Sequence, residues 1–156
     1  MLEIRIPGKE TLQLEYLVCD ITGTLTLDGQ IIPGVGLALD SLKSYLDIHL
    51  LSADTLRRAD DISQNLGIHL QKISPGSEAL NKADYVNELG SERIVAIGQG
   101  ANDALMLKQA ALGICVLSTE GTAVATLVSA HLVVPDIMSA LALLQNPMRI
   151  VATLRE

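Results

Sequence analysis

The chain has 156 residues, of which 49% are hydrophobic and 2% aromatic, and its formal net charge is -7. This length suits one domain spanning residues 1-156, and the high hydrophobic content favours an α/β protein whose strands are buried on both faces. The negative charge and scarce aromatic side chains argue against nucleic acid as a partner, since such proteins need a positive surface and stacking side chains.

The first third of the chain predicts two hairpins followed by a helix. Residues 2-6 alternate between apolar and polar, and residues 12-19 read as a second strand that becomes wholly apolar from Tyr16, so we expect an N-terminal β-hairpin. Asp28-Gly29 within residues 24-32 favours a second, tight hairpin. Pro33 is suited to open a helix. The apolar stripe of this helix is expected to consist of Val35, Leu39, Leu42 and Leu46.

Strands and helices then alternate to the end of the chain. The expected strands are 48-51, 68-73, 94-97, 113-117 and 131-134. The expected helices are 55-66, 77-89, 103-111 and 122-129, with one or two more after them. This alternation predicts a doubly wound, mainly parallel sheet with right-handed crossovers.

Cysteine usage and hydropathy bear on the compartment. Cys19 and Cys115 each lie inside an apolar run, as small buried hydrophobic residues do, which fits a reduced cytoplasmic protein. No apolar stretch reaches about 18 residues, and residues 1-8 lack the apolar core of a signal peptide. We therefore expect no membrane partner and no export.

Polar residues at strand ends matter most, because ligands of such sheets bind beyond the carboxyl ends of the strands. Asp20 directly follows an apolar strand and precedes a Thr22-Gly23-Thr24 turn, whose N–H groups can hold phosphate oxygens. Asp20 is thus a candidate nucleophile that attacks a phosphate ester, with a divalent metal to offset charge repulsion. The alternative is an aspartate that merely caps the turn.

Three further segments carry candidate residues. Ser52 follows the next apolar strand, where its hydroxyl can donate to a phosphate, although a serine before a helix is far more often an N-cap than a ligand. Lys82 can neutralise charge on a phosphoryl group, or it is simply a solvated helix lysine. The loop 98-103 reads Gly-Gln-Gly-Ala-Asn-Asp, in which glycines admit close approach and carboxylates can bind a hard cation. Its last residues can also be a plain helix cap.

In this order, the four segments resemble the motifs of the haloacid dehalogenase (HAD) superfamily. The segment 20-26 is similar to the Asp-Lys-Thr-Gly-Thr-Leu-Thr of the P-type ATPase phosphorylation domain, and residues 51-54 resemble the Leu-Thr-Gly-Asp of the same enzymes. The resemblance covers about residues 17-136 and indicates a soluble, P-type-ATPase-like HAD protein.

The resemblance implies a Mg²⁺-dependent phosphatase with a transient aspartyl phosphate, acting on a small phosphorylated substrate. It implies three catalytic residues, which are Asp20, Thr22 and Lys82. The implied phosphate-binding residues are Gly23, Thr24, Ser52, Ala53, Lys82 and Asn102. The implied metal ligands are Asp20, Thr22, Gln99 and Asp103.

Two residues depart from the HAD pattern. Thr22 stands where HAD phosphatases have a second aspartate, and a threonine cannot act as a base near neutral pH, so slow hydrolysis is expected. Gln99 replaces a usual metal-binding aspartate and removes one negative charge from the site. These departures favour, as an alternative, a weakened HAD-fold module that binds a phosphate ligand or a protein.

The spacing of the motifs leaves no room for a cap domain. Only about 31 residues separate Asp20 from Ser52, and about 16 separate Lys82 from Gly98. We therefore expect an open site, which a neighbouring subunit of a homo-oligomer would close. A receiver domain fits less well, because receivers carry an acidic pair at the end of the first strand and this chain has Asp20 alone.

Overall fold

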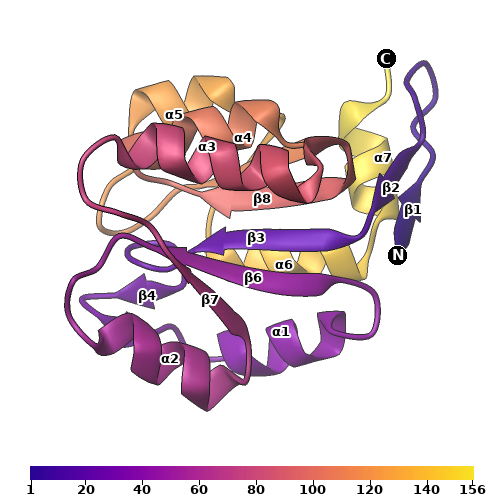
Figure 1. Ribbon diagram of the computed structural model, residues 1–156. Coiled ribbons are helices and arrows are strands. Elements are labelled where there is room, and N and C mark those ends of the chain that lie inside the picture. The colour runs from indigo at the N-terminus through magenta and orange to yellow at the C-terminus, as the bar shows by residue number, and fades with distance from the viewer.

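The computed structural model describes residues 1–156 and is built around a six-stranded parallel sheet (Figure 1). In spatial order its strands are β10 (Leu132–Val134), β9 (Leu112–Val116), β8 (Ile94–Gly98), β3 (Tyr16–Asp20), β6 (Asp47–Ser52) and β7 (His69–Lys72). Every neighbouring pair in this sheet is parallel. The predicted α/β fold with a parallel sheet is therefore confirmed.

Two small hairpins lie outside the main sheet. Strands β1 (Leu2–Ile4) and β2 (Leu12–Leu14) pair antiparallel, which confirms the N-terminal β-hairpin. Strands β4 (Thr26–Leu27) and β5 (Gln30–Ile31) form the second hairpin. Asp28 and Gly29 have φ of 51° and 80°, the positive values that a tight two-residue turn requires and that glycine adopts without strain.

Helices cover both faces of the sheet. Figure 1 shows α3, α4 and α5 on one face, whereas α1, α2 and α6 lie on the other. Their bounds are α1 Val35–Leu42, α2 Arg58–Leu66, α3 Glu78–Leu89, α4 Ala104–Gln109, α5 Val124–Ser129, α6 Ile137–Gln145 and α7 Met148–Leu154. Two short 3-10 turns, Ser91–Arg93 and Ala101–Asp103, precede β8 and α4.

The period-two pattern of the central strands divides the core between these two faces. Leu17 and Cys19 of β3 point into the cluster under α1 and α6, whereas Val18 points into the cluster under α3 and α4. All three side chains are fully buried. The continuous apolar run of β3 is thus explained by burial on both faces, as expected for a central parallel strand.

Three predicted boundaries were wrong. The run 12-19 is two strands, because the chain leaves the hairpin at Glu15 and joins a different sheet, where Glu15 N donates to Arg93 O and Glu15 O accepts from Asp47 N. Helix α1 ends at Leu42, so Leu46 is buried from the following turn and not from the helix stripe. Helix α2 begins at Arg58 and not near residue 55, because Asp54 accepts from Leu56 N in a local turn.

The order of the strands places one crevice at the centre of the sheet. From β3 the chain runs outward through β6 and β7, and then crosses back to β8 on the other side of β3. The connections that leave the carboxyl ends of β3 and β8 therefore run to opposite sides of the sheet, which makes this a topological switch point, where ligands of open α/β sheets bind.

No single helix is long and apolar enough to cross a membrane. Helices α6 and α7 together meet the length and composition test, but they are bent by 104° at the break between them.

Candidate functional site

Three central strands end on polar or glycine residues at the same edge of the sheet. Asp20 is the last residue of β3, Ser52 the last of β6 and Gly98 the last of β8. Parallel pairing aligns these ends, with Asp20 opposite Leu51 and Cys19 opposite Ile97. A cavity of about 460 Å³ opens there, and its lining includes Asp20, Thr22, Ala53, Lys82, Gln99 and Asn102. The edge therefore gathers most of the residues that the sequence nominated.

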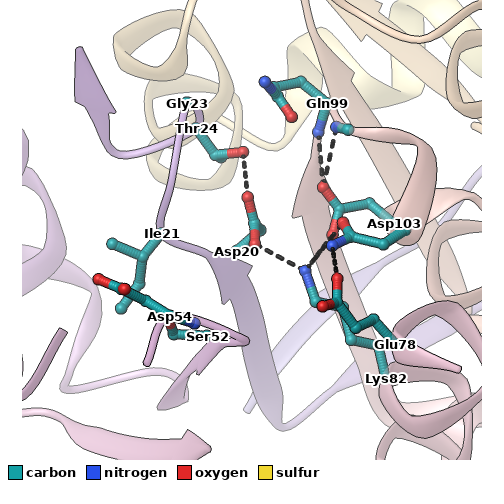
Figure 2. A network of polar contacts seen from close by, with 12 residues as sticks. Asp20, Ile21, Gly23, Thr24, Ser52, Asp54, Glu78, Lys82, Gln99 and Asp103 are labelled. Carbon is teal, nitrogen blue, oxygen red and sulfur yellow. Dashed lines mark hydrogen bonds and ion pairs between the residues drawn. The ribbon is translucent and has the colours of Figure 1, made fainter. Parts of the chain in front are cut away.

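Lys82 is the hub of this site (Figure 2). Its Nζ donates to Asp20 Oδ1 at 2.7 Å, to Asp103 Oδ1 at 2.8 Å and to Asn102 Oδ1 at 3.2 Å. The lysine is only 1% exposed, although it lies on helix α3. This burial shows that the alternative of a solvated lysine on the helix surface is wrong. The three oxygen partners are needed because a buried ammonium without them would be strongly destabilising.

Asp103 is held by the backbone of the glycine loop as well as by Lys82. Its Oδ2 accepts from Gln99 N and from Gly100 N, both at 3.0 Å. The side chain lies close against β8, because a Cβ added at Gly98 would be 2.6 Å from Asp103 Cγ. Gly98 therefore provides the space in which Asp103 reaches Lys82.

Gly98→Ala tests this role of the missing side chain. The backbone of Gly98 does not have a positive φ, so the clash with Asp103 is the main effect of an added methyl group. We expect a loss of about 1–3 kcal/mol in the free energy of unfolding, measured by urea denaturation. Gly36→Ala is the matched control, since its Cβ would meet only the flexible end of Leu66 at 3.3 Å. Equal stability of parent and Gly98→Ala would contradict the account.

The electrostatics of the site leave it short of positive charge. Burial raises the pKa of Asp20 to about 7, and the charge of Asp103 adds to this rise, whereas Lys82 and the hydroxyl of Thr24 oppose it. Burial lowers the pKa of Lys82, but the two carboxylates outweigh burial and the net change is upward. One buried ammonium thus serves two buried carboxylates, and oxygen donors with an excess of negative charge suit a hard divalent cation.

The loop after Asp20 is tied together internally. Thr24 Oγ1 donates to Asp20 Oδ2 at 3.1 Å, and Gly23 N donates to Thr26 Oγ1 at 3.2 Å. Gly23 has φ of 74°, which turns the chain sharply after β3. Thr24 thus orients the carboxylate of Asp20, and the predicted phosphate contacts of Gly23 and Thr24 stay predictions.

Ser52 and its neighbours lie on the β6 side of the cavity. Ser52 is 3% exposed, and its Oγ accepts from Asp54 N at 3.0 Å, which leaves its own proton free to donate. Figure 2 shows the carboxylate of Asp54 pointing away from Asp20. The hydroxyl of Ser52 therefore keeps a free proton, and its predicted contact with a phosphate oxygen stays a prediction.

Gln99 and Thr22 line the cavity without contacting the buried carboxylates through their side chains. The Gln99 amide turns toward the Gly23 loop and donates to Gly121 O at 3.3 Å, while the Gln99 backbone N–H contacts Asp103. Thr22 is exposed. The predicted roles of Gln99 and Thr22 as metal ligands stay predictions. For Gln99, a turn of the side chain is needed to bring its amide oxygen to the site.

Sequence reasoning missed Glu78. Its Oε2 accepts from Asn102 Nδ2 at 2.9 Å, so Asn102 bridges Glu78 and Lys82. Both ends of the Asn102 amide are thereby occupied within the protein. The available signal was spacing, since Glu78 precedes Lys82 by four residues and lies on the same face of α3.

Comparison with known sequences gives one relative that is matched over most of its length and one that is matched over a small part of it. No established family model matches the chain. It is 47% identical over 85 residues to an uncharacterised protein of Methanocaldococcus jannaschii, a match that spans 52% of this chain and 91% of that protein. It is also 30% identical over 80 residues to the chloroplast copper-transporting ATPase of Arabidopsis thaliana, which is 50% of this chain but 8% of the ATPase.

Solved structures match nearly the whole chain at low identity. A HAD superfamily hydrolase of subfamily III A from Legionella pneumophila has a TM-score of 0.72 at 17% identity, over 90% of this chain and 87% of that one. The cobalt-bound deoxy-D-mannose-octulosonate 8-phosphate phosphatase of Haemophilus influenzae has a TM-score of 0.71 at 15% identity, over 90% of this chain and 92% of that one. The Moraxella catarrhalis 3-deoxy-D-manno-octulosonate 8-phosphate phosphatase, bound to magnesium and phosphate, has a TM-score of 0.67 at 20% identity, over 92% of this chain and 95% of that one.

Proposed function

Because the chain belongs to the same family as the Methanocaldococcus protein and has a HAD-like fold, we propose that it is a phosphatase with Asp20 as nucleophile. One observation carries this proposal: a fully buried lysine joins two buried carboxylates at the switch point of a parallel sheet. Burying three charged groups is costly, and groups with strongly shifted pKa values in a cleft cluster at functional sites.

Mg²⁺ is the proposed cofactor. Asp20, the backbone carbonyl of Thr22 and Asp103 would hold it, with Gln99 as an amide ligand after a turn of its side chain. Mg²⁺ needs only one or two carboxylates beside water and phosphate oxygens, so this donor set fits. The cation would screen the repulsion between the carboxylate and the incoming phosphate.

The residues divide the reaction into two steps. The Asp20 carboxylate attacks phosphorus, the bond from phosphorus to the ester oxygen breaks, and the departing alkoxide takes a proton from solvent. Lys82 neutralises charge on the phosphoryl oxygens during the attack, and the hydroxyl of Ser52 donates a hydrogen bond to one of them. Water then adds to phosphorus, releases inorganic phosphate and restores Asp20. Since Thr22 supplies neither acid nor base, proton transfer depends on solvent and the reaction is slow.

Hydrolysis of para-nitrophenyl phosphate tests the proposal, because its leaving group departs without a proton from an acid. Purified protein is expected to release nitrophenolate with Mg²⁺ and to lose this activity in EDTA. Re-addition of Mg²⁺ should restore the rate, which excludes irreversible damage by the chelator. An equal rate with and without EDTA would contradict the metal-dependent mechanism.

Gln99→Asp tests the metal site separately. A carboxylate at this position adds a negative charge beside Asp20 and Asp103, and each added carboxylate strengthens attraction for a divalent cation. We expect the Mg²⁺ concentration for half-maximal activity to fall by about tenfold or more, which corresponds to roughly 1.4 kcal/mol. Gln109→Asp on helix α4 is the control and should leave the Mg²⁺ requirement unchanged. An unchanged Mg²⁺ requirement in Gln99→Asp would place residue 99 outside the site.

A non-catalytic phosphate-binding module is the second candidate. It is favoured by the Gln99 amide, which faces Gly121 and not the carboxylates, and by Asp103, whose two oxygens are both occupied. Such a module binds Mg²⁺ with beryllofluoride but gives no turnover of any phosphate ester. Turnover that depends on Asp20 rules it out.

We further propose that residues 1-156 act as one phosphotransfer domain of the P-type-ATPase-like branch, supported by the 80-residue match to the Arabidopsis ATPase. The site has no cap domain above it, so a second copy of the chain is the proposed means of closing it.

A further inference from the structure

A second hollow, of about 480 Å³, lies beside the cavity at Asp20. The two share Thr22 and Asp54 in their walls, so they are neighbours across these two residues. The hairpin β4–β5 forms one wall of the second hollow, helix α2 forms another, and the floor includes Ile21 and Ile62. A phosphate held at Asp20 would fill only the first cavity, which leaves the second for the rest of a substrate.

Arg58 is the only cationic side chain in the lining of the second hollow. It is exposed and takes part in none of the ion pairs of the protein, although Asp28, Asp54 and Glu120 line the same hollow. Its guanidinium lies over the hairpin turn, where a Cβ added at Gly29 would be 2.7 Å from Nη1. The glycine turn therefore lets Arg58 lie across the hairpin.

Each of the two cavities is lined by one cationic side chain, and only one of these two side chains has carboxylate partners. Lys82, the only cation in the lining of the first cavity, already serves Asp20 and Asp103. Arg58 has no carboxylate partner and presents a planar fork of donors that matches a carboxylate or a phosphate. A second negative group on a substrate could thus be paired only by Arg58.

We infer that Arg58 is a specificity-determining residue, which binds a second anionic group on the alcohol part of a phosphate monoester. This inference rests on the proposed phosphatase function and adds the substrate class to it. The reacting phosphate lies at Asp20, the alcohol part crosses between Thr22 and Asp54, and its far end carries a carboxylate or a second phosphate to Arg58.

The carboxylates of the second hollow make the inference sharper. Asp28 and Glu120 are exposed carboxylates, so they can accept hydrogen bonds from hydroxyl groups of a substrate and would repel its anionic end. Removing Arg58 should therefore lower the preference for an anionic substrate, and removing the charge of Asp28 should raise it. A hollow made for a cationic substrate would instead give the parent protein no preference for a substrate with a second anionic group.

Two pairs of six-carbon phosphates test this prediction. Gluconate 6-phosphate and sorbitol 6-phosphate differ by a carboxylate in place of a hydroxymethyl group. Fructose 1,6-bisphosphate and fructose 6-phosphate differ by a second phosphate. The parent protein is expected to have a kcat/KM at least about tenfold higher for the member of one pair that carries the additional negative group. The pair that shows this difference identifies a carboxylate or a second phosphate as the group that Arg58 binds.

Variants connect the preference to the hollow. Arg58→Gln should bring the ratio of the two kcat/KM values close to one, Arg58→Lys should keep part of it, and Asp28→Asn should increase it. Arg149→Gln, on helix α7 away from the site, is the control and should keep the parent ratio.

Two results would overturn the inference: equal kcat/KM for both members of both pairs in the parent, or an anionic preference that survives Arg58→Gln. Asp20-dependent release of phosphate from para-nitrophenyl phosphate would leave the proposed function intact in either case. If no ester is hydrolysed, calorimetric binding of the same compounds to Asp20→Asn with Mg²⁺ decides the matter by the same ratios. Equal affinities there would also overturn it.

Discussion

Asp20→Asn is expected to abolish phosphate release and, in the metal-free protein, to stabilise the fold. The loss of the nucleophile should lower kcat by at least about a thousandfold, as removal of other nucleophiles does. The amide fits the existing contacts, because its oxygen can accept from Lys82 and its nitrogen can donate to Thr24 Oγ1. Removing one of two buried carboxylates that face each other also relieves repulsion.

The stabilisation should depend on pH in a defined direction. The pKa of Asp20 rises from 3.8 in the unfolded chain to about 7 in the fold, so between these values the folded state binds more protons. The stability of the parent therefore falls as pH rises from about 4 to about 7, relative to Asp20→Asn. At pH 8 in EDTA, the variant should be more stable by roughly 2–4 kcal/mol.

Urea denaturation at pH 4 and pH 8, both in EDTA, measures this difference. The two proteins should have similar stability at pH 4 and should separate at pH 8. Asp136→Asn controls for the loss of a charge alone, since Asp136 caps α6 far from the site through Ser139 N. A variant that lost stability at pH 8 would show that Asp20 is a structural ion-pair partner and not a strained catalytic group.

Lys82→Met should have the opposite effect on stability. It leaves Asp20 and Asp103 buried without their shared cation, and breaking a buried pair by removing one partner costs about 3–5 kcal/mol. Methionine fills a similar volume, so loss of packing contributes little. At pH 8 the free energy of unfolding should fall by that amount, whereas Lys108→Met on the exposed face of α4 should change it by less than about 0.5 kcal/mol.

A double-mutant cycle separates charge from packing. Asp20→Asn in the Lys82→Met background removes a carboxylate that has lost its cation, so it should stabilise the protein by more than the same change does in the parent. Strictly additive single and double variants would mean that Lys82 and Asp20 do not interact, which is incompatible with a 2.7 Å ion pair.

Much of the fold and most of the candidate site could be predicted from local patterns. Strand β3 is apolar on both faces, and Asp20 follows it directly, so its place at the edge of the sheet follows from topology. The apolar runs before Ser52 and Gly98 likewise indicated that each of these residues follows a strand. These predictions depended only on where strands stop.

Contacts between distant segments could not be predicted in this way. The division of the run 12-19 at Glu15 depends on pairing with Arg93 and Asp47, which no local pattern records. The burial of Lys82 depends on Asp103 lying against Gly98, and the bridge from Glu78 to Asn102 depends on the packing of α3 against the loop after β8. The sequence pointed to the chemical groups, but only packing shows which of them share a proton or a charge.

The most direct measurement is a crystal structure of the protein soaked with Mg²⁺ and beryllofluoride. We expect density for beryllium bonded to a carboxylate oxygen of Asp20, with Lys82 and Ser52 contacting fluorine atoms and Mg²⁺ beside Asp20. Crystals of Asp20→Asn soaked in the same way should show none of these features. An unmodified Asp20 carboxylate in the parent crystals, still paired with Lys82 and without a nearby cation, would contradict the claim that this residue accepts a phosphoryl group.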